Sequence, residues 1–208
     1  MTSVSQKRFS RSQIILAAAV IVVLAAMVLD TKVVVIGSAA DVKEAVFEPA
    51  TFGAKTFPEV QADVTARAVD AVELATAIAA DAKAATAKYA IGGVFPVKLT
   101  GVVGEGKSGI YFVTVDGLPA PLTLRVQTGP AINGTELRDV TGKINFADFT
   151  NQIEFQDAGS AINNVLKTEV LAKIDNSALT GKTIALVGAF KLVNPKSWLI
   201  TPVALEVK

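Results

Sequence analysis

The sequence of 208 residues contains no cysteine and no histidine. Without a thiol or an imidazole, the chain cannot form a Cys or His zinc site, a cysteine nucleophile or a Ser-His-Asp triad. A metal site would need oxygen ligands only, which suits calcium or magnesium. The missing cysteine also leaves no residue to carry the lipid of a lipoprotein, so we expect no lipoprotein signal.

An excess of charge of one sign is also missing, because 20 basic residues stand against 19 acidic ones and the formal net charge is +1. No large basic surface for a nucleic acid is indicated. The distribution is uneven, since residues 1–13 hold Lys7, Arg8 and Arg11 and no acidic residue. The excess positive charge therefore lies before the long apolar run.

This apolar run extends without a charge from Ile14 to Leu29. It is slightly shorter than the about 20 residues that a spanning helix needs. Basic residues before the run place the N-terminus in the cytoplasm by the positive-inside rule. We expect residues 1–30 to be a cytoplasmic stub and a single-pass inner-membrane anchor, with a periplasmic body.

Two other interpretations of the run are open. A buried core helix is disfavoured by its uniform apolarity directly after a basic cluster. A cleaved signal peptide would use the small residues Ser38 and Ala40, with cleavage after Ala40. That position lies well beyond the apolar run, after Asp30 and Lys32, so we favour an uncleaved anchor.

The body begins with a helical pattern. After a short strand at Val33 to Ile36, alanine dominates residues 62–90, and small apolar residues recur from Val60 to Ala79 at helical spacing. Asp63 and Arg67 can pair across one turn, and Asp81 can cap a second helix ending at Tyr89. Phe52, Phe57 and Pro58 suggest a separate short helix or turn. We expect residues 31–93 to form the first strand and a helical subdomain.

After Gly93 the apolar period becomes two. Strands are expected at residues 94–100, 110–115, 122–127, 183–192 and 199–207, with a helix from about Asp157, its N-cap, to Ile174. This order predicts an α+β fold with an antiparallel sheet or a small barrel over residues 94–208. Trp198 is interpreted as a core residue, with a sugar-stacking face as the alternative.

Residues 101–108 match the P-loop pattern G-x-x-x-x-G-K-[ST]. A phosphate-binding P-loop needs a helix directly after it, so that the helix N-terminus can face the phosphates. Ile110 to Val115 reads as a strand instead. We therefore expect a hairpin turn around residues 104–106 and no nucleotide binding.

The long polar segment between the third strand and the helix is the candidate binding site, because functional loops tend to be long and irregular. Its candidate ligand-binding residues are Asn133, Arg138, Asp139, Asp148, Asn151 and Gln152. The alternative is that these residues only tie the loop to the sheet. Asp139, Asp148, Glu154 and Asp157 do not have EF-hand spacing, so turn and cap roles are favoured and neither a metal nor a cofactor is expected.

Three segments carry a family resemblance: N-G-T-E-L-R-D-V-T-G at residues 133–142, F-A-D-F-T-N-Q at 146–152, and S-A-I-N at 160–163. Together they resemble a bacterial family of predicted periplasmic lipoproteins of unknown function, over about residues 33–208. F-E-P-A-T-F at 47–52 also fits, with Glu48 where the family has aspartate. The resemblance implies an OB-like β-barrel with an added helical region, no enzymatic activity, and an association with sugar-type ABC import systems. The family's lipid-bearing cysteine is absent.

These observations lead to one expected function and two alternatives. We expect a non-enzymatic periplasmic accessory or binding protein, attached to the inner membrane through Ile14 to Leu29. The resemblance suggests an ABC import permease or its binding protein as the partner. A carbohydrate-active enzyme using Asp139 and Asp148 is the first alternative, and its two carboxyls should face one cleft. A structural envelope protein without a ligand is the second.

Overall fold

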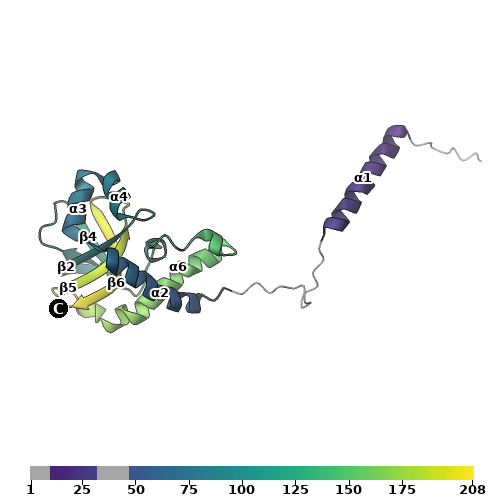
Figure 1. Ribbon diagram of the computed structural model, residues 1–208. Helices are drawn as coiled ribbons and strands as arrows, with labels where there is room; N and C mark the ends of the chain where they lie inside the picture. Colours follow the sequence, from purple (N-terminus) through teal and green to yellow (C-terminus); the bar gives the residue numbers. More distant parts are fainter. Residues whose placement is uncertain (1–9, 32–46) are drawn as a thin grey trace, which may run out of the picture. The chain divides into compact units, whose positions relative to one another are not determined.

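The computed structural model describes residues 10–31 and 47–208 (Figure 1). Contacts divide the chain into two units, residues 1–46 and residues 47–208. The strand expected at Val33 to Ile36 and the alternative cleavage position after Ala40 lie outside the described residues. The division predicted at residue 93 falls within the second unit, between a helix and a strand, and stays a prediction.

The first unit contains one long helix, α1 (Arg11–Asp30). Its N-terminus is closed by a capping box, in which Ser10 Oγ accepts from the Gln13 amide and Gln13 Oε1 accepts from the Ser10 amide. No residue of α1 is buried, and the helix is long and apolar enough to cross a membrane. The predicted N-terminal apolar helix is confirmed.

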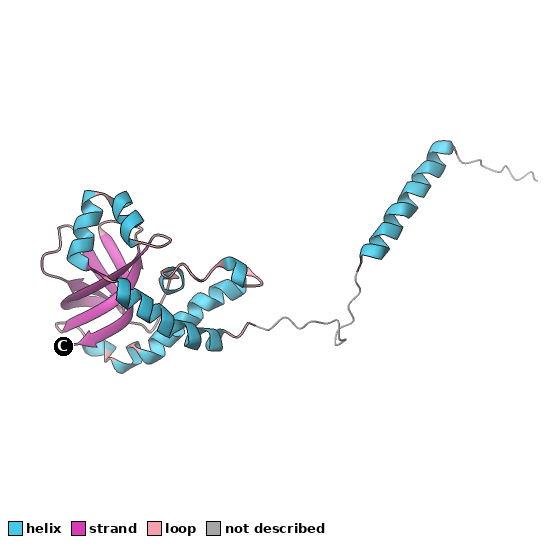
Figure 2. Ribbon diagram, viewed as in Figure 1, coloured by secondary structure: helices cyan, strands magenta, loops and turns pink. Residues whose placement is uncertain are grey.

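The second unit is built on a six-stranded sheet (Figure 2). The strands are β1 (Val69–Asp70), β2 (Val94–Lys107), β3 (Ile110–Thr114), β4 (Thr123–Gln127), β5 (Thr183–Lys191) and β6 (Ser197–Val207). Their order is β1-β2-β3-β4-β6-β5, and β2 also pairs with β5, so five strands form a closed ring of pairings.

The sheet is mixed, which corrects the prediction of an antiparallel one. β4 and β6 run parallel, as do β1 and β2. Parallel neighbours need a long crossover rather than a hairpin. The connection from β4 to β6 contains a long helix and β5, and the connection from β1 to β2 contains two shorter helices.

The longer helices are α2 (Pro49–Arg67), α3 (Ala71–Ala80), α4 (Ala82–Tyr89) and α6 (Gln152–Glu169), and the short α5 is Glu136–Asp139. Phe52, Phe57 and Pro58 belong to α2, not to a separate element. The helical face expected from Val60 to Ala79 is interrupted, because Val69 pairs with Val97 of β2. The ion pair of Asp63 with Arg67 and the cap by Asp81 are confirmed.

Helix α6 begins earlier than predicted. Asn151 is its N-cap, because Asn151 Oδ1 accepts a hydrogen bond of 3.0 Å from the Glu154 amide. Asp157, the predicted cap, lies inside the helix. The early start brings Gln152 and Gln156 onto the helix, beside the loop that precedes it.

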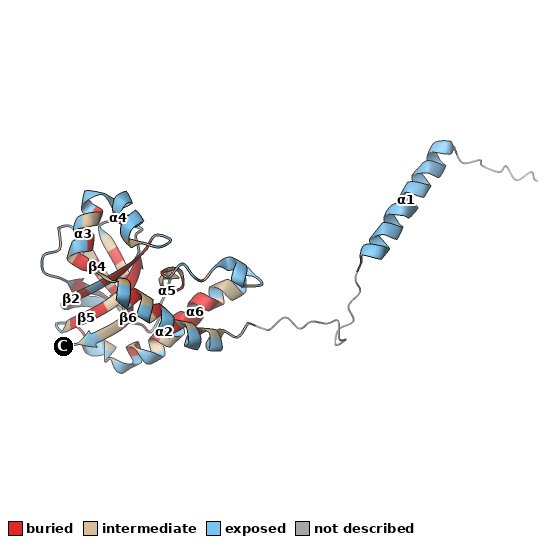
Figure 3. Cartoon of the chain, in the orientation of Figure 1, coloured by how far each residue is buried: buried red, intermediate tan, exposed pale blue. Residues whose placement is uncertain are grey.

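Two hydrophobic cores stabilise the second unit, and Figure 3 shows the buried residues in red. The first lies between the strands and α3, and its centre is a stack of Phe95, Phe190 and Trp198 with ring centroids 5.4 and 4.3 Å apart. Trp198 is only 1% exposed, so its interpretation as a core residue is confirmed. The second core joins α2 and α6 to β2, β5 and β6.

The P-loop pattern at residues 101–108 forms the end of β2 and the start of a hairpin. The turn lies at Ser108 and Gly109, both with positive φ, slightly later than expected. β3 follows at once and pairs antiparallel with β2, with a register shift between Val103 and Gly106. The hairpin interpretation is confirmed, because no helix follows the pattern as a phosphate cradle requires.

Candidate functional site

The predicted binding residues lie in the segment from β4 to α6, where α5 presents Arg138 and Asp139 side by side. Arg138 is 8% exposed. Its Nε donates to Asp139 Oδ1 at 2.8 Å, and its Nη1 donates to the Phe155 carbonyl at 3.0 Å. The guanidinium carbon also lies 3.7 Å from the centre of the Phe155 ring. These contacts fix the guanidinium group in one orientation.

Asp139 is held from its other side as well. Its Oδ2 accepts a hydrogen bond of 2.7 Å from Thr135 Oγ1, so both carboxylate oxygens have partners within α5 and its N-cap. Asp139 therefore positions the Arg138 guanidinium rather than projecting into open solvent.

The other predicted residues have different surroundings. The backbone of Asn133 forms two hydrogen bonds of 3.0 Å with the buried side chain of Gln127: its carbonyl accepts from Nε2 and its amide donates to Oε1. These bonds attach the loop to the end of β4. Asp148 Oδ2 accepts from the Asn145 amide at 2.9 Å, and Asn151 caps α6. Of the six residues, Arg138 and Gln152 line a common cavity.

This cavity has a volume of about 390 Å³ and lies between α5 and the first turns of α6. It is lined by Gly134, Thr135, Arg138, Gln152, Phe155, Gln156 and Ser160. A guanidinium, two amides and two hydroxyls thus face one space beside an aromatic ring. This set can donate and accept hydrogen bonds to a small polar molecule.

Sequence reasoning did not select Thr135, Gln156 and Ser160. A signal was present, because Gln152, Gln156 and Ser160 recur at four-residue spacing and so share one face of α6. The signal was hidden by the predicted helix start at Asp157, which placed Gln152 and Gln156 outside the helix.

Glu136, on the same short helix, is electrostatically strained. Its Oε2 is buried and has no hydrogen-bond partner among the described residues. Burial raises the pKa of the Glu136 carboxyl, and the charge of Asp139 adds to this, while a backbone hydrogen bond and Lys191 lower it. The carboxylate also lies against the Cα of Gly134, where a side chain would overlap it.

Glu136→Gln is expected to stabilise the protein at neutral pH by about 1 kcal/mol, because it removes a buried charge. The raised pKa means that the folded state holds the proton more tightly than the unfolded state. The protonated Glu136 side chain therefore contributes fully to the stability of the folded state below the ordinary pKa of 4.5. This contribution is lost as the pH rises through the raised pKa of the folded state. Unfolding in urea at several pH values measures this, and the advantage of the variant should shrink towards pH 4.

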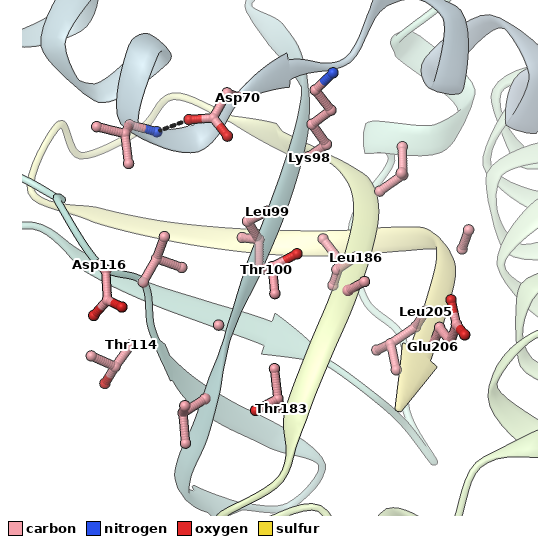
Figure 4. A pocket seen from close by; sticks show the side chains of 17 residues that line it. Asp70, Lys98, Leu99, Thr100, Thr114, Asp116, Thr183, Leu186, Leu205 and Glu206 are labelled. Carbon is pink, nitrogen blue, oxygen red and sulfur yellow. Dashed lines mark hydrogen bonds between the residues drawn. The ribbon is translucent and has the colours of Figure 1, made fainter. Parts of the chain in front are cut away.

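A larger depression lies on the outer face of β2, β5 and β6, with a volume of about 880 Å³. In Figure 4, Thr114 and Asp116 lie at one side of this groove and Leu205 and Glu206 at the other. Asp70 also lines it, but its Oδ1 caps α3 by accepting from the amides of Val72 and Glu73.

The groove is less organised than the Arg138 cavity. Its acidic groups form no ion pair within the described part of the chain, and residues 10–31 and 47–208 contain no group of three acidic side chains arranged to hold a metal. Sequence reasoning did not select the groove, although Lys98, Thr100 and Val102 alternate on the outer face of β2. The Arg138 cavity is therefore the stronger candidate site.

Residues 17–206 match the family model described as predicted periplasmic lipoprotein (DUF2291). The chain belongs to this family. The family predicted from residues 133–163 is thereby confirmed. Membership in DUF2291, together with the apolar helix α1, supports a membrane-anchored periplasmic protein. The sequence contains no cysteine, which is the residue that carries the lipid in a lipoprotein.

A solved structure supports the fold of this DUF2291 chain. An OB-fold protein from Thermotoga maritima superposes with a TM-score of 0.62 at 20% sequence identity, covering 79% of this chain and 100% of the other. The OB-like part of the predicted fold is confirmed at the level of the fold alone. A search among curated proteins finds no match to the chain.

Proposed function

We propose that the chain is a membrane-anchored periplasmic binding protein without enzymatic activity, which holds a small polar ligand in the Arg138 cavity and serves a sugar-type ABC import system. The observation that carries this proposal is the buried Arg138 guanidinium, fixed by Asp139 and Phe155 at a polar cavity. We also infer that the closed ring of strand pairings is the predicted OB-like barrel, acting as the rigid support of the site.

The chemistry of the cavity suits a sugar or a sugar acid. Gln152, Gln156 and Ser160 offer both donors and acceptors, which matches the paired donor and acceptor character of sugar hydroxyls. The guanidinium of Arg138 can bind a carboxylate or a ring oxygen. Because its contacts with Asp139 and Phe155 are already formed, little ordering is needed when a ligand binds.

The contacts of Asp139 and Asp148, the two candidate catalytic residues, support ligand binding rather than glycoside hydrolysis. Glycoside hydrolysis needs two carboxyls that face one cleft, about 5–10 Å apart. Asp139 instead accepts from Arg138 and Thr135, and Asp148 caps the turn at residues 146–148. A cavity lined by polar groups also argues against a purely structural role.

Calorimetric titration of the full chain with neutral sugars and sugar acids tests the ligand proposal. Gln152→Ala combined with Gln156→Ala should weaken binding by about tenfold or more, as loss of two hydrogen bonds implies, without unfolding the chain, since both side chains are exposed. Asn164→Ala, an exposed amide on the same helix but outside the cavity, is the matched control. Equal affinity in the two variants would exclude the cavity as the site.

The link to import is tested separately by purification from membranes in a mild detergent. We expect a sugar-type ABC permease or its binding protein to accompany the chain. Purification of the chain alone, under conditions that preserve known permease complexes, would refute the accessory role while leaving ligand binding intact.

A further inference from the structure

Five phenylalanine side chains gather where the chain enters the second unit. They come from the start of α2, the 3-10 turn at residues 146–148 and the first turns of α6, and we call them the phenylalanine patch: Phe47, Phe52, Phe146, Phe149 and Phe155. The five rings form a connected series with centroids 5.4 to 5.7 Å apart. The patch thus joins three segments at one end of the unit.

The phenylalanine patch is not closed off from solvent. Phe146 is 54% exposed, and the other four rings are partly buried. Ile153, in the neighbouring first turn of α6, is 72% exposed. Figure 3 shows the turn before α6 and the first turn of this helix mainly in pale blue. In contrast, Phe95 and Phe190 of the first core are fully buried. A series of partly exposed aromatic rings offers a surface on which another apolar phase can bind.

The position of the patch in the chain points to the lipid bilayer as this apolar phase. Phe47 is the first residue of the second unit, and α1 ends at Asp30. The intervening residues 31–46 can span at most about 55 Å, at roughly 3.5 Å per residue. In a chain anchored by α1, the patch therefore cannot move further than about 55 Å from the end of α1. Tethering of this kind gives a high effective concentration, so that even a weak contact is populated.

The charges around the patch indicate how it would bind. Glu48, Lys55, Lys143 and Asp148 are all exposed and include both signs. Attraction to anionic headgroups needs an excess of basic residues, which these residues do not provide. Contact with lipid would therefore rest on burial of the apolar side chains at the interface.

We propose that the phenylalanine patch inserts into the interface of the bilayer that holds α1, and so docks residues 47–208 on the membrane surface. Phe146, the most exposed ring of the patch, and Ile153, in the neighbouring first turn of α6, enter the lipid. This inference rests on the anchoring by α1 that is part of the proposed function. It does not depend on a ligand in the Arg138 cavity or on an import system.

The absence of cysteine allows the test to be made with single labels on the full chain. Three variants, Ile153→Cys, Val193→Cys and Val22→Cys, carry an environment-sensitive fluorophore in phosphatidylcholine vesicles that contain a lipid-attached quencher. Val193, 85% exposed on the turn between β5 and β6, is the matched control, and Val22 lies in α1. We expect the label at 153 to be quenched several-fold more than the label at 193, with no effect of high salt or anionic lipid.

Each other outcome overturns the inference in a recognisable way. Quenching at 22 but not at 153 means that α1 is anchored and the patch is not docked. No quenching at 22 means that the anchoring itself fails, and the docking with it. As a second variant, Phe146→Ser in the Ile153→Cys chain should reduce the quenching at 153 while the unfolding temperature stays unchanged, because Phe146 is half exposed. Unchanged quenching would show that the patch is not the contact.

Discussion

Replacing Arg138 with methionine is expected to lower the free energy of unfolding by about 2–4 kcal/mol and to abolish ligand binding. Methionine retains much of the apolar volume, but it removes the donor to Asp139 Oδ1 and the hydrogen bond from Arg138 to the Phe155 carbonyl. The contact with the Phe155 ring is also lost. Unfolding in urea, followed by the emission of the single buried Trp198, measures the loss.

Lys143→Met is the control for this prediction, because Lys143 is an exposed cation in the same loop. Its effect should stay within about 0.5 kcal/mol. Arg138→Lys should fall between the two, since an ammonium group cannot reproduce the planar fork of a guanidinium. An equal loss of stability in the Lys143 and Arg138 variants would mean that the contacts of Arg138 do not stabilise the fold.

Replacing Gly109 with alanine is expected to destabilise the chain by about 3 kcal/mol or more. Gly109 has a φ of 76°, and a Cβ at this position would overlap the carbonyl oxygen of Gly129. The two segments are also joined by a hydrogen bond of 2.7 Å from the Thr128 amide to the Gly109 carbonyl. The hairpin could not accept the methyl group without moving away from Thr128 and Gly129. The same urea unfolding measures the effect.

Gly181→Ala separates the two causes of this effect. Gly181 has a similar φ of 81°, but no atom lies within 4 Å of the added Cβ. It should therefore cost only about 1 kcal/mol, from backbone strain alone. Lys107→Ala should leave stability unchanged, because Lys107 is exposed at the end of β2. The result would contradict the hairpin interpretation if the lysine proved essential and Gly109→Ala were tolerated.

Much of the fold could be predicted where local pattern and tertiary packing agree. Leu124 and Val126 alternate with polar residues and face the first core, as a strand with one buried face requires. The helical region was harder, because alanine favours a helix at every position and gives no sign of an interruption. The break at Ala68 depends on the pairing of Val69 with Val97, and such a non-local contact leaves no trace in the local spacing.

The candidate site could be predicted in part. Arg138 and Gln152 were selected and line one cavity, and Asp139 holds the guanidinium. Asp148 and Asn151 were selected for the same polarity, but each completes a local cap. Polarity alone does not distinguish a ligand contact from a backbone cap, because both satisfy the same kind of hydrogen bond. That distinction requires the direction in which each side chain points.

The ring of Phe155 belongs to two surfaces at once. One face carries the guanidinium of Arg138, and the ring also packs against Phe146 and Phe149 of the phenylalanine patch. A change of state at either surface therefore acts on a side chain of the other. If a ligand alters the affinity of the patch for lipid, thermodynamic reciprocity requires lipid contact to alter the affinity for the ligand by the same factor. The protein with its patch in the lipid and the protein with its patch in water would then bind the ligand with different affinities. A ligand affinity measured without a bilayer would describe only the second of these two states.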